Sequence, residues 1–371
     1  MQQFKDKVFE KFLSGRDKSL HIHDVDIKRW ALEINKELNI SDFCASDRWL
    51  YYFKYDYGIV SRKITKLITS VTFETDIIKK SNEFLEICKN VINQVDPFCV
   101  INTDQTGFNY ELYSKRTLSH IGEKTTSLIV SSMSSITHSY TVQPAITMNG
   151  KLLSKFYLCL KETNGNFGPR VQSELPTNFP NVIIRCSSSG KMTKDLVIDF
   201  NQQIIQPLYQ QKIVYIADSW SGQTNSEIYE NIFGNQCEFL QIPPHCTSIV
   251  QPLDVYFFRF WKLIAKKIYN EVLLHSWNVD LKQRNQIIKL HCLIHNQLSS
   301  SIFENLICYS WFRSGYLTER PIFNDVSEVC FPKLLDNCQI FDCTRHSFIN
   351  CSHCNLSLCF GHFFIEVHSH F

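Results

Sequence analysis

No apolar run in this 371-residue sequence approaches the roughly 18 residues that a membrane-spanning helix needs. The N-terminus, MQQFKDKVFE, is charged from its fifth residue and lacks the apolar segment of a signal peptide. Internal repeats and low-complexity segments are also missing. We therefore expect a soluble, intracellular protein with no membrane partner. An apolar content of 44% is enough for a large buried core in two or three domains.

The sequence also has almost no net charge. Its 38 lysines and arginines nearly balance 36 aspartates and glutamates, which leaves a formal charge of +2 at pH 7. No global field therefore attracts nucleic acid or an anionic membrane surface. A nucleic-acid-binding surface would have to come from local patches of basic residues.

A complete phosphate-binding loop is missing as well. The segment SSSGKMT superficially resembles one, but that motif needs a glycine five residues before Gly190 and a serine or threonine directly after the lysine. The chain has Arg185 and Met192 at those two positions. The neighbouring His245 and Cys246 are poor candidates for a nucleophilic pair, because adjacent side chains rarely face each other.

Cysteine, by contrast, is abundant, with 15 residues in the chain. Because intracellular compartments keep thiols reduced, we do not expect a disulfide framework. The distribution is uneven, and the last part of the chain holds six of the cysteines together with five histidines: Cys330, Cys338, Cys343, Cys351, Cys354, Cys359, His346, His353, His362, His368 and His370. This concentration of thiol and imidazole groups indicates a metal-binding tail.

Within this tail, Cys351-x2-Cys354-x4-Cys359-x2-His362 forms two short chelating pairs that suit a tetrahedral Zn²⁺. We predict one structural zinc ion bound by these four residues; the alternative is that the cysteines bind no metal. Other residues of the tail could supply a second, cross-braced site: Cys338, Cys343, His346, His368 and His370. Zinc would let so short a segment fold without a large core, as a DNA- or protein-binding knuckle.

The N-terminal part of the chain is predicted to be helical over 1–69, with a linking helix over 70–97. Apolar residues recur there at helical spacing: Ile27, Trp30, Ala31, Ile34 and Leu38. Ser46 is expected to cap the next helix and Gly58 to end it.

From residue 98 the pattern changes to short β-rich runs separated by turn signals. The predicted strands span 98–102, 127–131, 140–147, 152–160, 212–218 and 237–244. The predicted helices span 194–206 and 253–274. Strands followed by alternating helices and strands predict a mixed α/β domain.

Three aspartates lie at the ends of these predicted elements. Asp104 follows the first strand, Asp218 ends the apolar strand IVYIA, and Asp254 lies beside Pro252 in the first turn of a helix. Ligands of open α/β sheets gather at the carboxyl ends of strands, and carboxylates that converge there need a cation between them. Two divalent ions at such a place can promote phosphoryl transfer. The alternative is that each aspartate only caps a helix or a turn.

Three stretches around these aspartates, NTDQTGFN, IADSWSGQT and IPPHCTSIVQPLDVYFFRFWK, resemble the DDE-type transposases of the pogo/Tigger group in the mariner superfamily. The aspartate triad of that family maps onto Asp104, Asp218 and Asp254, and the resemblance covers about 98–300. It implies an RNase H-like fold. It also implies Mg²⁺- or Mn²⁺-dependent cleavage of double-stranded DNA, by water and then by a DNA 3′-hydroxyl, with the metals held by the three aspartates.

The resemblance extends to the N-terminal part, where DIKRWALEINKELNI and the following residues are similar to the helix-turn-helix of centromere protein B. It implies that Trp49 and Phe53 pack in the core, and that Arg62, Lys63 and Lys66 contact DNA phosphates. The alternative is that these cations only form a solvated helix face. Relatives usually carry a further helix-turn-helix upstream, which is not in this sequence, and a His or Asn near the place of Gln223.

A second basic group follows Asp254 along the predicted helix and consists of Arg259, Lys262, Lys266 and Lys267. Over 255–300 the chain has seven basic residues against two acidic ones. Such a surface is suited to the DNA backbone, although a solvated face is a common meaning of such a run. The apolar residues interleaved with these cations are expected to be core rather than a base-stacking surface.

The expected organisation is an α/β protein with an RNase H-like mixed sheet flanked by helices, an all-α helix-turn-helix domain before it and a small Cys/His zinc-binding tail after it. The segments are 1–69, 70–97, 98–300, 301–334 and 335–371. The leading hypothesis is a DNA-binding, transposase-like endonuclease, expected to dimerise on two DNA ends and to act in the nucleus. The alternative is a domesticated, transposon-derived DNA-binding protein without catalysis, and a third hypothesis makes the tail a protein-interaction module.

Overall fold

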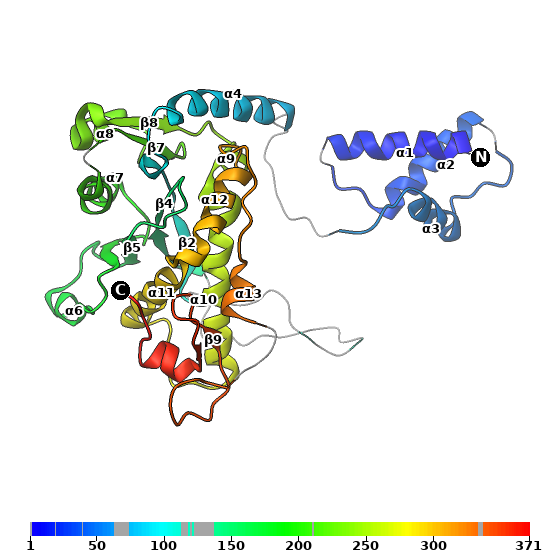
Figure 1. The fold of residues 1–371 in the computed structure, drawn as a ribbon. Helices are drawn as coiled ribbons and strands as arrows, with labels where there is room; N and C mark the ends of the chain where they lie inside the picture. The colour runs from blue at the N-terminus through cyan, green and yellow to red at the C-terminus, as the bar shows by residue number, and fades with distance from the viewer. Residues whose placement is uncertain are drawn as a thin grey trace. The chain divides into compact units, whose positions relative to one another are not determined.

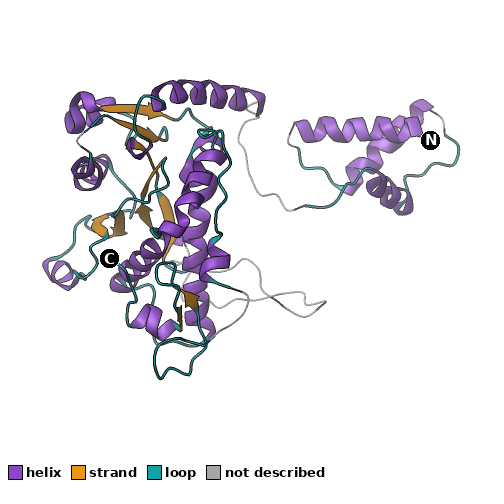
Figure 2. Ribbon diagram, viewed as in Figure 1, coloured by secondary structure: helices purple, strands orange, loops and turns teal. Residues whose placement is uncertain are grey.

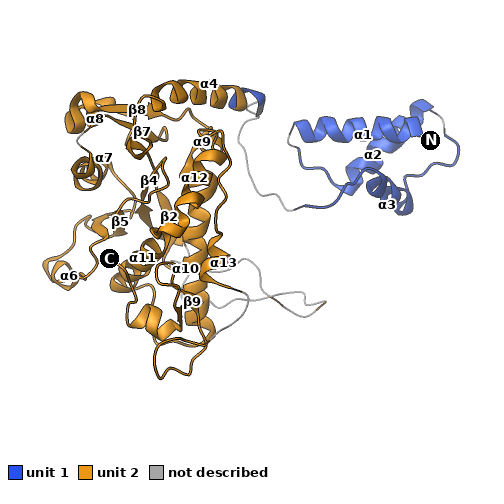
Figure 3. Ribbon diagram, in the orientation of Figure 1, with its two compact units in different colours: residues 1–77 blue, residues 78–371 orange. Residues whose placement is uncertain are grey.

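The computed structural model describes residues 2–18, 20–38, 40–62, 74–112, 118, 121, 137–209, 211–332 and 337–371. The chain divides into two compact units, Met1–Ile77 and Ile78–Phe371 (Figure 3). The predicted strand 127–131 and the predicted DNA contacts Lys63 and Lys66 lie outside the described residues. Among the helices of the described ranges, none is long and apolar enough to cross a membrane.

The first unit contains the helices α1 (Gln2–Asp17), α2 (Asp24–Leu38) and α3 (Asp47–Asp56). They enclose a small core formed by Phe4, Val8, Ile27, Ala31, Ile34, Ala45, Leu50 and Phe53. Ser46 caps α3 as predicted, because its hydroxyl accepts a hydrogen bond from the Trp49 N–H at 3.2 Å. The rings of Trp49 and Phe53 stack with their centroids 5.2 Å apart, and Phe53 is fully buried, so both contribute to the core as expected.

The predicted linking helix is α4 (Glu74–Ile92). A 3-10 turn, η1 (Pro97–Cys99), then takes the place of the first two residues of the predicted strand. Asp96 stabilises this turn, because its side chain accepts a hydrogen bond from the Phe98 N–H at 2.7 Å. The strand therefore begins two residues later than the sequence pattern indicates.

Two four-stranded sheets form the centre of the second unit. The first has the order β4-β1-β7-β8 and consists of β1 (Val100–Thr103), β4 (Ala145–Thr147), β7 (Ile213–Ala217) and β8 (Cys237–Gln241). The second has the order β2-β3-β5-β6 and consists of β2 (Thr106–Asn109), β3 (Ser139–Gln143), β5 (Phe156–Lys161) and β6 (Val182–Ser187). Parallel and antiparallel pairs occur in both, which confirms the predicted mixed α/β class. Strands β2 and β6 were not predicted.

The two sheets continue each other in register. Thr103 lies opposite Ala145 in the first sheet, and Thr106 lies opposite Val142 in the second, so no residue is inserted or deleted between them. The segments β1 and β2 therefore act as one interrupted strand, paired along its length with the interrupted strand formed by β3 and β4.

The interruption falls at Asp104, which stands opposite Pro144 in this register. Proline has no N–H to donate to a strand ladder, so the pairing must open there. The Thr103 hydroxyl donates to the Pro144 carbonyl at 2.8 Å and accepts a hydrogen bond from the Gln143 amide at 3.2 Å. A side chain thus provides a hydrogen bond to the Pro144 carbonyl at the point where Asp104 leaves the sheet.

Helices lie on both faces of the strands (Figures 1 and 2). On one side, α7 (Lys194–Phe200), the π-helical turn η2 (Asn201–Ile205) and α8 (Ser226–Phe233) bury apolar residues against β1, β5 and β7. On the other side, the fully buried Trp261 of α10 (Phe258–Leu274) packs edge-on against Phe156 of β5 at 5.5 Å. Both predicted helices of this domain are confirmed, each with a π-helical turn at one end.

Beyond α10, helix α11 (Arg284–Leu298) is buried along most of its length. The segment 301–334, expected to be a connection, holds helices α12 (Glu304–Arg313) and α13 (Val326–Cys330). From residue 337 to the C-terminus the chain has little regular structure: the two-residue strands β9 (Ile349–Asn350) and β10 (Ser357–Leu358), and the turn η7 (Gly361–Ile365).

Candidate active site and metal centres

Asp104 lies at the break between β1 and β2 and is only 7% exposed. Burial raises its pKa well above the ordinary value, and the negative charges of Asp254 and Asp218 raise it further. The Gln105 backbone N–H offsets part of this effect by hydrogen bonding to the carboxylate. The three predicted aspartates, which come from distant parts of the sequence, are therefore close enough to act on one another electrostatically.

Asp254 lies in the π-helical turn η5 (Leu253–Phe257), directly after Pro252 and before α10. Desolvation raises the pKa of this carboxyl, while a hydrogen bond with Asp104 and the positive charge of Lys262 lower it in part. The residue as a whole is exposed, unlike Asp104. Of these two residues, Asp104 is therefore buried and Asp254 is accessible.

Asp218 follows the last residue of β7 and is half-buried. Its carboxylate accepts hydrogen bonds from the Trp220 N–H at 3.3 Å and from the Gln223 side-chain amide. Gln223 is itself held in place, because its backbone carbonyl accepts a hydrogen bond from the Tyr229 hydroxyl at 3.1 Å. Gln223 thus orients Asp218 at the place where the family resemblance leads one to expect a His or Asn.

A buried amide completes this cluster. Gln251 is fully buried, lies close enough to Asp104 to lower its pKa, and has neither amide atom in a well-formed hydrogen bond within the described residues. Three mutually repelling carboxylates and an unsatisfied amide oxygen form a donor set of hard oxygen atoms, which fits Mg²⁺ or Mn²⁺. The aspartates do not all lie within 4.8 Å of one another, unlike the Cys/His groups of the described tail.

The four predicted cations of α10 differ in their surroundings. Arg259 stacks over the Tyr256 ring at 3.7 Å and over the Phe260 ring at 4.4 Å, and its guanidinium is 3.7 Å from the Asp325 carboxylate. Lys267 lies 5.4 Å from the Phe331 ring.

Lys262 and Lys266 line a cavity of about 140 Å³ together with Gly107, Phe108, Asn109 and Leu112. Lys262 also interacts with the charges of Asp254 and Asp104, and desolvation lowers its pKa despite them. Lys262 thus lies beside the aspartate cluster and Lys266 lies next to it in the cavity, while Arg259 is held by aromatic rings. In the first unit, the predicted DNA contact Arg62 is exposed.

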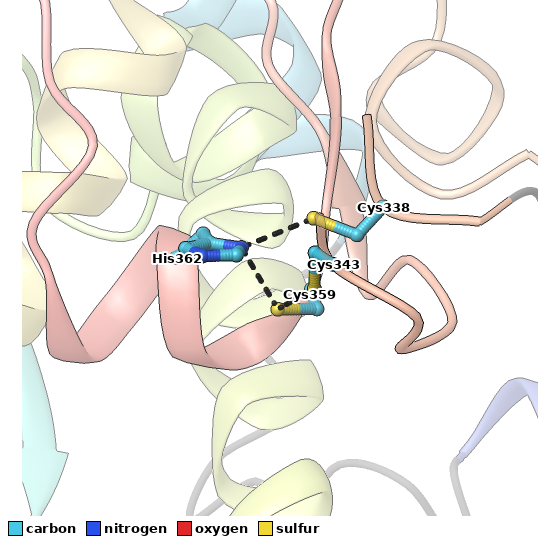
Figure 4. A group of neighbouring side chains, drawn as sticks. All are labelled: Cys338, Cys343, Cys359 and His362. Atoms are coloured by element: carbon cyan, nitrogen blue, oxygen red, sulfur yellow. Dashed lines mark hydrogen bonds between the residues drawn. The ribbon is translucent and has the colours of Figure 1, made fainter. Parts of the chain in front are cut away.

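The first Cys/His group brings together Cys338, Cys343, Cys359 and His362, whose ligand atoms all lie within 4.8 Å of one another (Figure 4). The His362 Nδ1 atom is 3.1 Å from the Cys338 sulfur and 3.3 Å from the Cys359 sulfur. Burial alone would raise the pKa of Cys338, but hydrogen bonds from the Cys359 and Ile340 backbones and from His362 lower it to about 7. A partly ionised thiol is suited to metal binding.

The second group brings together Cys351, Cys354, His368 and His370. The Cys354 sulfur is 3.4 Å from His368 Nε2, which is 3.1 Å from His370 Nε2. The predicted single zinc site is therefore split, because the β9–β10 hairpin places Cys351 and Cys354 at its turn and Cys359 beyond its open end. Each half meets a different pair of ligands.

The order of these ligand pairs along the chain alternates between the two groups. Pairs one and three, Cys338/Cys343 and Cys359/His362, form the first group; pairs two and four form the second. The two groups are cross-braced, but the ligand set expected for a second site is wrong: Cys338 and Cys343 belong to the first group, His368 and His370 to the second, and His346 to neither. Each group offers four nitrogen or sulfur ligands, as a structural zinc site does.

Comparison with known families identifies two parts of the chain. Residues 160–304 match the DDE superfamily endonuclease model, and residues 311–371 match the Tc5 transposase C-terminal domain. Over 160–304 the chain is therefore similar to DDE superfamily endonucleases. Asp218 and Asp254 lie within the DDE match, whereas Asp104 precedes it.

Solved structures with similarity to the chain include complexes of the Mos1 transposase. The paired-end complex with the left transposon end is 10% identical, with 74% of this chain and 77% of that chain covered and a TM-score of 0.41. The strand transfer complex is 12% identical, with 84% and 86% covered and a TM-score of 0.40. The mariner paired-end complex with Mn is 11% identical, with 79% and 85% covered and a TM-score of 0.40.

Proposed function

We propose that this DDE domain protein is a pogo/Tigger-like transposase that binds double-stranded DNA and cleaves it with Mg²⁺ or Mn²⁺ held by Asp104, Asp218 and Asp254. The observation that carries this proposal is the convergence of three carboxylates near the break in the strands. Their mutual repulsion and their burial disfavour the charged forms, and a bound cation would relieve both effects. Two of the three lie in the segment that matches the DDE superfamily endonuclease model.

Divalent ions bound there would supply an activated water and neutralise charge at the phosphate. The chain's own residues would fix the geometry: Gln223 and the Trp220 N–H orient Asp218, and burial fixes Asp104. Lys262, whose charge acts on Asp254 and Asp104, and Lys266, which lines the same cavity as Lys262, would bind the phosphate backbone of the strand to be cut. In the first unit, a centromere-protein-B-type helix-turn-helix would bind DNA, with Arg62 at its exposed C-terminal end.

The C-terminal tail would bind two zinc ions, one in each Cys/His group, rather than the single ion predicted from the local spacing. Its role in this proposal is structural: the metals would hold a segment that has only two-residue strands.

Pairing of two DNA ends would require two protomers, and a DNA substrate places the protein in the nucleus. Size-exclusion chromatography with and without DNA, and imaging of the tagged protein in cells, test these two points.

The decisive experiment is metal-dependent nicking of DNA by the full chain, compared with Asp218→Asn. The substitution keeps the shape of the side chain but removes a negative ligand, so nicking should fall to background. Asp195→Asn, the same change at an exposed position of α7, serves as the control and should leave nicking intact. Nicking that survives Asp218→Asn would sink the assignment. Absence of nicking on DNA that the protein binds would favour the domesticated DNA-binding alternative.

A further inference from the structure

A buried polar side chain of β1 lies where the aspartate-bearing elements meet. Asn102, on β1, is fully buried, as are its strand neighbours Ile101 and Thr103. Buried asparagines are costly unless both halves of the amide are hydrogen-bonded. Here both are: Nδ2 donates to the Ile216 carbonyl at 3.0 Å, and Oδ1 accepts from the Leu253 N–H at 3.2 Å.

The positions of these partners relative to the aspartates connect the amide to the site. Ile216 lies two residues before Asp218 on β7, and Leu253 directly precedes Asp254. Asn102 itself lies two residues before Asp104. One side chain, two residues before Asp104, thus hydrogen-bonds to the chain within two residues of each of the other two aspartates.

The Leu253 N–H has a particular need for this partner. It lies in the first turn of η5, where backbone N–H groups have no acceptor within the helix. Leu253 is fully buried, so water cannot supply one. Asn102 therefore acts as a cap from a distant strand and fixes where the helix carrying Asp254 begins relative to the sheet.

We propose that Asn102 is the positioning residue that sets the spacing of Asp104, Asp218 and Asp254. The inference rests on the proposed function, because it assumes that these aspartates bind the divalent ions. The amide holds the end of β7 and the start of η5 against β1, so the carboxylates are preorganised before metal binds. Without it, η5 is free to shift, and the metal must assemble its own ligand set at a cost in affinity.

The test compares Asn102→Leu with a matched control, Asn181→Leu. Asn181 is also buried in the second unit and also bridges elements, since its amide donates to the Cys292 carbonyl at 3.0 Å and contacts His295 Nδ1 at 3.0 Å. Both substitutions remove a buried asparagine whose amide makes two polar contacts, although both contacts of Asn181 are made by Nδ2 and reach α11. They differ in whether the aspartate-bearing elements are involved.

Mn²⁺ binding by the zinc-loaded full chain is measured by calorimetry, and the site is defined as the binding that Asp218→Asn removes. We expect Asn102→Leu to weaken this binding by 10- to 100-fold, as loss of a supporting hydrogen bond does at metal sites. Hydrogen exchange without metal should also speed up over 251–257 in Asn102→Leu and not in Asn181→Leu. Both variants should lose thermal stability.

Unchanged Mn²⁺ affinity in a folded Asn102→Leu variant would overturn the proposal, as would equal weakening by Asn181→Leu. If Asn102→Leu does not fold, Asn102→Thr replaces it: its β-branched side chain suits a strand, but its hydroxyl is too short to reach both partners. Unchanged affinity in that variant overturns the proposal equally. If the unmodified chain shows no Mn²⁺ site sensitive to Asp218→Asn, the proposed function fails, and this inference with it.

Discussion

The aspartate cluster and the two Cys/His groups are both candidate metal centres, but the fold supports them in opposite ways. Two four-stranded sheets position the aspartates, and the hydrogen bonds of the buried Asn102 amide hold the surrounding backbone. The Cys/His ligands lie on a tail with two-residue strands, yet their atoms converge within 4.8 Å. The core therefore forms the first site with or without metal, whereas metal should form much of the structure around the second.

The largest effect should follow from loss of a tail ligand. Cys338→Ser removes a thiolate from the first group, and we expect 337–371 to lose most of its protection from hydrogen exchange while the sheets keep theirs. Structural zinc contributes on the order of 10 kcal/mol, more than so small a hairpin can replace. Cys44→Ser, at an exposed cysteine of the first unit, is the control. A tail that stays protected in Cys338→Ser would remove the contrast between the two centres.

At Asp104, by contrast, removal of a ligand is expected to stabilise the metal-free chain. Its pKa is raised by burial and by its two aspartate neighbours, so the folded state favours the protonated form. A raised carboxyl pKa means that stability is fully present below the unfolded pKa and is lost as pH rises toward the folded pKa. Asp104→Asn should therefore stabilise the metal-free chain at pH 7, by about 1.4 kcal/mol for each unit of pKa elevation that is relieved.

Thermal unfolding with and without Mn²⁺ measures this effect. The unmodified chain should gain stability with Mn²⁺, and the Asp104→Asn variant should be more stable without the ion but gain nothing from it. A variant less stable than the unmodified chain in metal-free buffer would mean that Asp104 has a structural partner, and that the cluster is not strained by mutual repulsion.

The two centres also differ in how far the sequence predicts them. The three aspartates can be predicted because each lies at the end of a predicted strand or helix and within a short sequence motif. The pairs Cys351/Cys354 and Cys359/His362 are equally visible. The sequence does not show which pairs share an ion. A hairpin of two-residue strands leaves no periodic pattern, so nothing indicates that the two pairs belong to different sites.

Long-range support is harder still to predict. The hydrogen bonds of Asn102 join residues 114 and 151 positions apart, and a lone asparagine in an apolar strand gives no sign of its partners. Strand β6 is only half-buried, and its sequence VIIRCS has an apolar run of just three residues and no clear alternation. The interruption of the strand pairing at Pro144 is interpretable once the register of the strands is known, but the proline alone does not identify its opposite residue.

A smaller effect concerns two histidines that are buried in the core of the second unit. Burial lowers the pKa of His291 to about 3 and that of His295 to about 4. The His291 Nδ1 atom accepts a hydrogen bond from the Trp261 indole at 2.9 Å, which requires the neutral ring. A depressed histidine pKa means stability that is present above the unfolded pKa near 6.5 and is lost as pH falls toward the folded value.

Urea unfolding between pH 7 and pH 5 should therefore show a fall of up to about 1.4 kcal/mol per pH unit for each of these histidines. His291→Gln can keep the hydrogen bonds with the Trp261 indole and the Tyr140 hydroxyl, and it should reduce that slope by about one proton. His275→Gln, at an exposed position after α10, should leave it unchanged. An identical slope in His291→Gln would show that the acid sensitivity comes from elsewhere, the tail ligands included.

The smallest expected effect separates the cations of α10, which the sequence treats as one group. Lys262 lies beside the aspartates, whereas Arg259 is stacked on Tyr256 and Phe260. A lysine that neutralises one phosphate contributes about one unit to the slope of log affinity against log salt concentration. Lys262→Ala should lower the slope for DNA binding by that amount, while Arg259→Ala should lower stability and leave the slope nearly unchanged. Equal slope changes would mean that the whole basic face of the helix contacts DNA, as the charge pattern alone suggests, and that the aromatic contacts of Arg259 yield when DNA binds.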